Sequence, residues 1–139
     1  IIMYNCSSWS PTTQAVEKLD ICHRRHLRKL LNIHWPQGII SNENLYKRCN
    51  SVKLSERVHK ARWKLLGHIL RGADDTPAAL AFNFALTTNC KGRRGRHRMN
   101  LFTVIVNDLK SRNLKLGSLN DLNDIKLLAN DRVAWRNAF

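Results

Sequence analysis

The chain has 139 residues, 43% of them apolar, with 24 lysines and arginines against 10 acidic residues. This length fits one domain or one lobe of a larger protein, and the apolar content is enough for an ordinary core, which argues against intrinsic disorder. The formal net charge of +14 indicates a polyanionic partner. No apolar stretch approaches the roughly 20 residues that a bilayer crossing needs, so we expect no membrane partner.

The positive charge is regional. Twelve lysines and arginines but only two acids lie between Ile21 and Gly72, whereas three bases balance three acids from Gly117 to Phe139. We expect the basic region to bind nucleic acid by counterion release, with an affinity that falls steeply as salt rises. The balanced C-terminal part is expected to form a polar cap.

The N-terminal residues and the cysteines suggest where the protein resides. The chain begins Ile1-Ile2-Met3 without a charged leader, so we expect it to be part of a longer reading frame. We expect the protein to be intracellular, in the nucleus and cytoplasm, and not secreted. The cysteines are too widely spaced for a zinc site and are expected to be reduced thiols. His23 and His26 lie three residues apart, but the cations around them repel a dication, so no metal is expected there. The cysteines are Cys6, Cys22, Cys49 and Cys90.

The first predicted helix is amphipathic. Thr12 or Thr13 can cap a helix that extends to about Leu31, where the sequence His34-Trp35-Pro36-Gln37-Gly38 stops it. One face is apolar and the other is cationic, which predicts that the cations contact phosphate. The apolar face comprises Val16, Leu19, His23, Leu27 and Leu30, and the cationic side comprises Arg24, Arg25, Arg28 and Lys29.

Two further helices are predicted before residue 73. Ser41 can cap a short helix through about Cys49, and Ser55 can cap the next one behind Leu54. Gly72 is placed for a left-handed C-terminal cap. In the longer helix Val58, Ala61, Leu65 and Ile69 form the apolar stripe, widened by Leu66 and Leu70, and Lys60, Arg62, Lys64 and Arg71 lie off it.

Gly67 lies inside this helix and is followed by His68. Glycine within a helix costs about 1 kcal/mol relative to alanine unless a neighbour packs closely against it. We therefore expect tight helix packing at Gly67 and a half-buried polar contact at His68, rather than a general base.

Three more elements follow along the chain. Thr76-Pro77 predicts a helix to Leu86, although the alternation of Leu80, Phe82, Phe84 and Leu86 would equally suit a strand. A helix from about Arg98 to Arg112 carries Phe102, Ile105, Val106 and Leu109 on one face and is broken at Leu116-Gly117-Ser118. The last helix, from about Asn120 to Asn137, places Leu122, Ile125, Leu128, Ala129 and Trp135 inward, with Asp121 and Asp124 at its positive end.

These patterns together predict an all-α fold. We expect a small irregular bundle of about five or six helices with a basic loop. The apolar residues Ile1 to Tyr4 could form a short strand stub.

The basic loop is the sequence Lys91-Gly92-Arg93-Arg94-Gly95-Arg96-His97-Arg98. Glycine lets a backbone approach a phosphate chain closely, and guanidinium groups match phosphate oxygens bidentately. The loop therefore predicts binding to a nucleic-acid backbone with little base-reading. The alternative is a solvated loop with incidental charge. The predicted contacts are Lys91, Arg93, Arg94, Arg96 and Arg98.

The sequence offers little for catalysis. A two-metal nuclease or polymerase needs converging carboxylates, and the only adjacent acidic pair, Asp74-Asp75, suits a turn and cap. No phosphate-binding glycine loop, nucleophile elbow or H-E-x-x-H motif is present. We expect no catalytic residue, no metal and no cofactor in this segment. The weaker alternative is an enzyme that uses His68 with Asp74 or Asp75.

Seven ordered motifs carry a family resemblance. They are Tyr4 with Trp9, Leu19 to Leu31, Ile33-His34-Trp35, Ser41 to Tyr46, Leu66-Gly67-His68-Ile69-Leu70-Arg71, Gly92 to Arg96, and Asp131-Arg132-Val133-Ala134-Trp135-Arg136. Their order resembles the region that follows the polymerase core in non-LTR (LINE-like, RTE-type) retrotransposon reverse transcriptases with an N-terminal endonuclease. The resemblance covers nearly the whole chain, and its structural landmarks are Trp35, Gly67, His68 and Trp135.

The resemblance implies a function. The catalytic aspartates of that family lie upstream in the palm, so the segment would be a non-catalytic thumb and C-terminal extension. It would grip template RNA or primer-template duplex through Arg24 to Lys29 and the basic loop. Its implied partners are RNA and/or DNA and the upstream polymerase domains. The alternative is a module that docks on the polymerase body through Trp35, Trp63 and Trp135 and carries its charge incidentally.

The same resemblance suggests a division of the chain. Residues 1–72 would form a thumb-like basic helical region, and residues 73–98 a linker with a short helix and the basic loop. Residues 99–139 would form a C-terminal helical pair.

Overall fold

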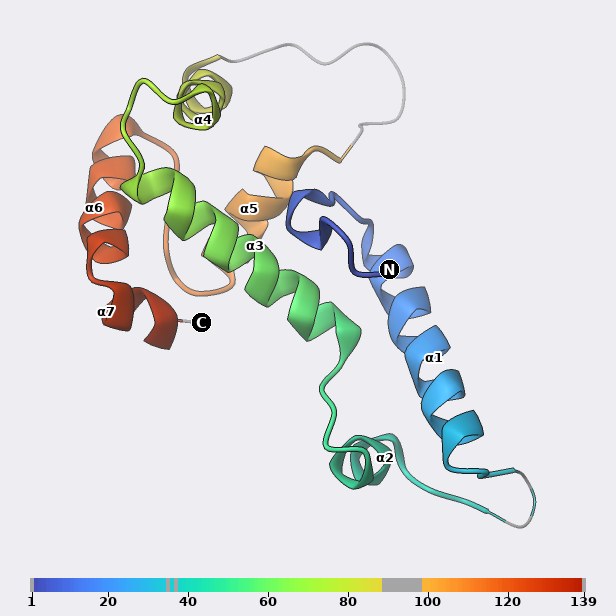
Figure 1. The fold of residues 1–139 in the computed structure, drawn as a ribbon. Helices are drawn as coiled ribbons and strands as arrows, with labels where there is room; N and C mark the ends of the chain where they lie inside the picture. The colour runs from blue at the N-terminus through green and yellow to red at the C-terminus, as the bar shows by residue number, and fades with distance from the viewer. Residues whose placement is uncertain (1, 35, 37, 89–98, 139) are drawn as a thin grey trace. The chain divides into compact units, whose positions relative to one another are not determined.

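The computed structural model describes residues 2–34, 36, 38–88 and 99–138 (Figure 1). In these residues it contains helices and no strand, which confirms the all-α prediction and shows that the expected N-terminal strand stub is wrong for its described residues. Those residues form a turn before a short 3-10 helix. The elements are η1 (Cys6–Ser8), α1 (Thr13–Leu30), α2 (Asn42–Arg48), α3 (Leu54–Arg71), α4 (Pro77–Thr87), α5 (Leu101–Lys110), α6 (Leu119–Asn130) and α7 (Arg132–Asn137).

The chain forms two compact units, with one boundary after Ser10 and a second within α3. The small unit is Pro11–His59, and the large unit combines Ile1–Ser10 with Lys60–Phe139. The division into residues 1–72, 73–98 and 99–139 remains a prediction. No helix among the described residues is long and apolar enough to cross a bilayer.

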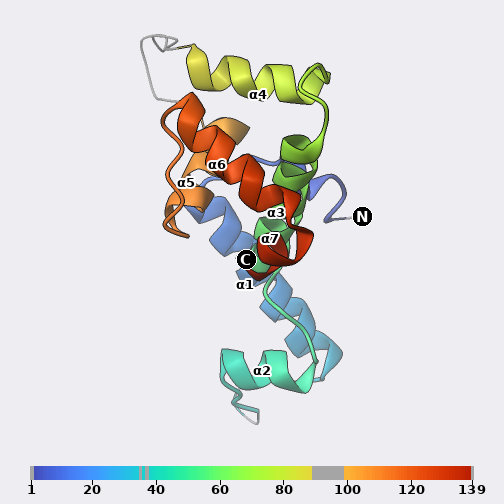
Figure 2. The same ribbon diagram turned by 90° about the vertical axis from the view of Figure 1, so that its left-hand side faces the viewer.

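In the small unit, α2 packs across the C-terminal part of α1 (Figure 2). Leu45 and Tyr46 of α2 are buried, and the Tyr46 ring lies 5.7 Å from the ring of His23 on α1. The first turn of α3 is held by Asp20, whose carboxylate accepts hydrogen bonds from Ser55 N at 3.0 Å and Ser55 Oγ at 2.6 Å. The expectation that Ser55 caps α3 is therefore wrong, because the helix already begins at Leu54.

Three helices end at an asparagine in the left-handed conformation. Asn32, Asn50 and Asn113 have φ angles of 53°, 44° and 60°. After each one, the next N–H donates back into the last turn, for example from Ile33 to the Arg28 carbonyl at 2.9 Å. This is the Schellman geometry, in which asparagine can replace glycine. The turn at Asn32 therefore ends α1 before the Pro36 region, and the turn at Asn113 ends α5 before the Gly117 region. Those two regions were expected to stop the helices.

The N-terminal caps agree with the sequence at three helices. Thr12, Ser41 and Thr76 each accept a hydrogen bond from a backbone N–H in the first turn of α1, α2 and α4, respectively. The segment from Pro77 is a helix, so the alternative strand is wrong. The helix expected from Arg98 instead begins at Leu101, because Asn100 caps it through Thr103 N.

The core of the large unit joins α3 to α4, α5, α6 and α7. Its buried apolar side chains come from all five helices and from the segment before α6. The rings of Phe82 and Phe102 pack edge to face at 5.3 Å, which links α4 to α5. The core residues are Trp63, Leu66, Leu70, Phe82, Ile105, Leu109, Leu116, Leu122, Ile125, Ala129 and Trp135.

The buried face of α3 differs from the expected stripe. Ala61 and Leu65 are only half-buried, whereas Arg62 is 3% exposed. The Arg62 side chain is buried because Nε donates to Asp108 Oδ2 of α5 at 2.8 Å. Gly72 does not adopt the left-handed conformation expected of it.

The single C-terminal helix expected from Asn120 is two helices. α6 ends at Asn130, and the Asp131 backbone is extended while its carboxylate accepts hydrogen bonds from Val133 N and Ala134 N of α7. At the start of α6, Ser118 and Asp121 form a capping box. The Gly117 N–H donates to Asp121 Oδ2 at 2.9 Å and lowers the pKa of that carboxyl below its usual value.

Candidate nucleic-acid interface

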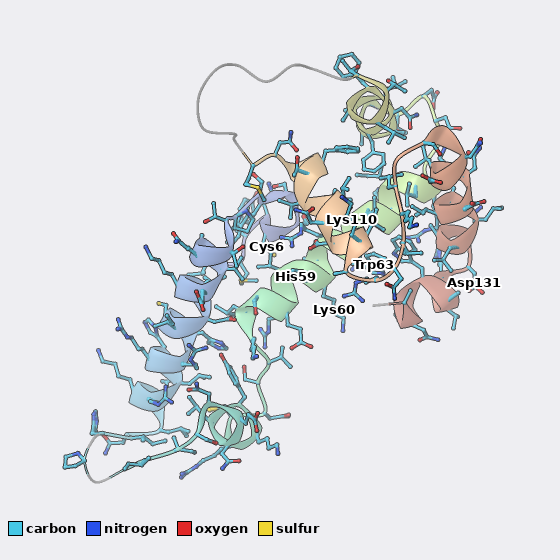
Figure 3. All side chains as sticks on the ribbon, turned by 180° about the vertical axis from the view of Figure 1, so that it is seen from behind. Cys6, His59, Lys60, Trp63, Lys110 and Asp131 are labelled. Atoms are coloured by element: carbon cyan, nitrogen blue, oxygen red, sulfur yellow. The ribbon has the colours of Figure 1, made fainter. Side chains whose placement is uncertain are left out.

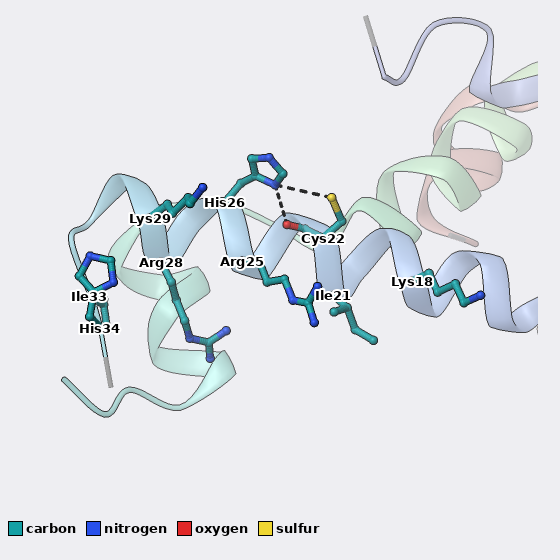
Figure 4. A pocket seen from close by; sticks show the side chains of 9 residues that line it. All are labelled: Lys18, Ile21, Cys22, Arg25, His26, Arg28, Lys29, Ile33 and His34. Atoms are coloured by element: carbon teal, nitrogen blue, oxygen red, sulfur yellow. Dashed lines mark hydrogen bonds between the residues drawn. The ribbon is translucent and has the colours of Figure 1, made fainter. Parts of the chain in front are cut away.

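An open groove of about 720 Å³ lies along α1 and the residues after it (Figure 4). Four of its nine lining residues are permanent cations, two are histidines and none is acidic. Three exposed residues, Lys18, Arg25 and Lys29, share one face at helical spacing. The groove is lined by Lys18, Ile21, Cys22, Arg25, His26, Arg28, Lys29, Ile33 and His34. We call it the α1 groove.

The α1 groove has a length that suits a strand of nucleic acid. Lys18 and Lys29 are eleven residues apart on one helix, which corresponds to about 16 Å along its axis. One strand of B-form DNA carries about five phosphates over that length, at ~3.4 Å per phosphate. Sequence reasoning missed Lys18, although its spacing of seven and eleven residues from Arg25 and Lys29 is a signal for the shared face.

The four cations predicted on α1 do not have equal roles. Arg25 and Lys29 are exposed in the groove, as expected. Arg28 also lines it, but its Nη2 donates to Asn42 Oδ1 at 2.8 Å and so connects α1 to the start of α2. Arg24 is half-buried and does not line the groove. Leu30, expected on the apolar face, is 82% exposed.

His26 contacts Cys22 one turn earlier on α1. Its Nδ1 lies 2.8 Å from the Cys22 carbonyl oxygen and 3.6 Å from Cys22 Sγ (Figure 4). A carbonyl oxygen only accepts, so this Nδ1 carries the hydrogen. His23 lies against Tyr46 instead, so α1 does not aim the two histidines at one point. No group of three or more His, Cys, Asp or Glu side chains suited to a metal occurs among the described residues.

His23 lies on the half-buried side of α1. Burial lowers the pKa of its imidazole below the usual value of 6.5, and the positive charge of Arg57 on α3 lowers it further. The Asp20 carboxylate raises the pKa, while His26 and Arg24 lower it. The neutral imidazole is therefore favoured in the folded protein.

Several predicted site residues lie outside the described residues. These are the basic-loop contacts Lys91, Arg93, Arg94, Arg96 and Arg98, and the landmark Trp35. The binding role assigned to the basic loop stays a prediction.

The two landmark residues of α3 differ in environment. Gly67 is buried against α7, where an added Cβ would collide with the Trp135 indole, so the expected tight packing is confirmed. His68 is exposed rather than half-buried. Asp74, one of the two aspartates named in the enzyme alternative, forms an ion pair with Lys126 of α6.

Trp63 and Trp135 are 5% and 4% exposed, because their indole rings stack within the core of the large unit. Figure 3 shows Trp63 on α3 and Asp131 at the start of α7. The expectation that these two tryptophans form a docking surface is therefore wrong.

Comparison with known proteins gives no match, whether to family models, to curated proteins or to solved structures.

Proposed function

We propose that this chain is a non-catalytic nucleic-acid-binding segment of a non-LTR retrotransposon reverse transcriptase. The observation that carries the proposal is the α1 groove, in which four permanent cations and two histidines occur without an acidic side chain. Such a surface attracts a phosphate backbone and releases its counterions. The net charge of +14 and the seven ordered motifs support the same function.

In this function the segment holds RNA or DNA while upstream domains perform polymerisation. Lys18, Arg25 and Lys29 contact phosphates spaced along one strand, and the basic loop from Lys91 to Arg98 adds further contacts. Contacts of this kind position the strand and carry no base information. The grip is therefore tolerant of sequence, as template handling by a polymerase requires.

A salt titration tests the proposal. We would measure the affinity of the whole chain for a short fluorescein-labelled RNA by anisotropy over a series of salt concentrations. Replacing Lys18, Arg25 and Lys29 with glutamine should reduce the slope of log K against log salt by about 2, at ~0.7 per phosphate contact. Replacing Arg93, Arg94 and Arg96 should reduce it by a similar amount.

The small unit offers a matched control. Lys47, Arg48 and Lys53 are three exposed cations outside the α1 groove, so their replacement with glutamine removes equal charge. This control should leave the slope nearly unchanged. Equal losses in both variants, or wild-type binding that is insensitive to salt, would overturn the proposal. An upstream reading frame without a polymerase aspartate pair would overturn the assigned parentage.

A second candidate function is docking onto the polymerase body. Leu80 and Phe84, one turn apart on α4, are 55% and 64% exposed, and this apolar pair favours it. Replacement of both with serine should then abolish association with the upstream polymerase domains while RNA binding by the isolated chain persists. The cation variants of α1 would not affect such docking.

A further inference from the structure

A second basic groove lies within the large unit, between α3 and α7, with a volume of about 540 Å³. Five of its eight lining residues are permanent cations, one is a histidine and none is acidic. The lining residues are Lys60, Trp63, Lys64, His68, Arg71, Arg132, Trp135 and Arg136. We call it the α3–α7 groove.

The cations of the α3–α7 groove form two rows. Lys60, Lys64 and Arg71 lie along one face of α3, spaced over about 16 Å of helix axis. Arg132 and Arg136 lie one turn apart on α7. Two cationic rows with a channel between them fit an extended strand with negative charge on its backbone, because successive phosphates can meet either row.

The cations are held on a rigid base. Trp63 and Trp135 stack at 4.0 Å with an interplanar angle of 7°, which joins α3 to α7 beneath the groove. Arg71 is fixed by a hydrogen bond from Nη1 to the Ala129 carbonyl at 2.9 Å. Two helices that are already packed together lose less conformational entropy on binding than segments that must first become ordered.

The acidic residue that precedes α7 caps that helix. Asp131 accepts the hydrogen bonds of Val133 N and Ala134 N with its Oδ1 atom. Lys60, Lys64, Arg132 and Arg136 are exposed, and within the described chain no ion pair or side-chain hydrogen bond involves them. Their charges are available to a ligand.

We infer that the α3–α7 groove binds the phosphodiester backbone of an RNA or DNA strand, as a second contact separate from the α1 groove. This inference rests on the proposed function, because it assumes that the chain binds nucleic acid. Both tryptophans are too buried for bases to stack on their faces, so the contact is to phosphate and is independent of sequence.

Lysine footprinting of the whole unmodified chain tests the inference. The chain would be acetylated with and without saturating RNA, and the modification of each lysine read by mass spectrometry. Lys60 and Lys64 should lose reactivity in the complex and recover it at high salt. Lys110 and Lys115, exposed lysines of the same unit outside the groove, should stay reactive.

Two further arms identify the ligand. The footprinting experiment is repeated with inorganic tripolyphosphate in place of RNA, and again with phosphatidylserine vesicles. Weak or absent protection by both supports a strand ligand. Equal protection by tripolyphosphate would mean a compact phosphate site, and protection by vesicles alone would mean a membrane surface. Either result would overturn the inference.

Substitution gives an independent readout. Replacing Lys60 and Lys64 with glutamine should reduce the salt slope of RNA binding by about 1.4, at ~0.7 per contact, and so should replacing Arg132 and Arg136. Replacing Lys110 and Lys115 should not change it. If the chain binds RNA while Lys60 and Lys64 stay fully reactive, the inference about the α3–α7 groove is overturned but the proposed function is not. If the chain does not bind RNA, both are overturned.

Discussion

Trp63 and Trp135 exchange hydrogen bonds across their stacked rings. Trp63 Nε1 donates to the Trp135 carbonyl at 2.8 Å, and Trp135 Nε1 donates to the Trp63 carbonyl at 3.2 Å. Each indole therefore buries its ring and satisfies its only donor against the same partner. This reciprocal pair holds the short helix α7 on α3 and forms the base of the α3–α7 groove.

Gly67→Ala should destabilise the large unit by about 1–3 kcal/mol, the usual range for overpacking a core. The added methyl group would collide with the Trp135 ring, and this outweighs the gain of about 1 kcal/mol in helix propensity. Urea unfolding measures the change. Gly117→Ala is the control, because its Cβ would meet Asp121 Oδ2 at an ordinary 3.6 Å. Unchanged stability in Gly67→Ala would contradict the packing described.

The ion pair between buried Arg62 and half-buried Asp108 should be costly to break from one side. Asp108→Ala removes the carboxylate to which Arg62 Nε donates, and the loss of a hydrogen bond between charged groups typically destabilises a protein by about 1.5–3 kcal/mol. A double variant, Arg62→Met with Asp108→Leu, should be more stable than Asp108→Ala, because no charge remains buried. Denaturant unfolding of the wild type and the two variants gives the comparison, and a double variant no more stable than Asp108→Ala would contradict it.

Asn113 should tolerate glycine but not alanine. Its φ of 60° costs an ordinary residue about 1–2 kcal/mol, while glycine adopts it freely. We therefore expect Asn113→Ala to lower the thermal midpoint and Asn113→Gly to leave it nearly unchanged. Differential scanning calorimetry distinguishes them. Equal midpoints for the two variants would show that the left-handed conformation is not required.

His23 should make the small unit less stable in acid. Its folded pKa is lowered by burial and by Arg57, so between that value and 6.5 the unfolded chain binds more protons than the folded one. Stability is therefore full above about pH 6.5 and is lost as the pH falls through the folded pKa. Urea midpoints across this range provide the measurement.

A variant isolates the histidine contribution. His23→Gln should weaken the pH dependence near pH 6.5, because the titrating group is absent. His34→Gln, at an exposed position, should retain it. A wild-type stability that is constant across this range would count against the assignment.

The sequence predicted features that depend on local periodicity and capping. The helices and the caps at Thr12, Ser41 and Thr76 follow from hydrophobic spacing and from side-chain oxygens placed before a helix. The cationic side of α1 was predictable for the same reason, since helical spacing sets which residues share a face. Asn32, Asn50 and Asn113 were a further local signal, because asparagine adopts the left-handed conformation that ends a helix more readily than most residues.

Only the tertiary structure decided the features that depend on partners distant in sequence. Arg62 is buried because Asp108 lies 46 residues away in the chain and yet 2.8 Å away in space. The groove between α3 and α7 likewise depends on two tertiary features. Trp135 stacks on Trp63, 72 residues away in sequence, and the helical backbone is interrupted at Asp131. Periodicity reports which residues share a helix face, but it does not report which other helix that face meets.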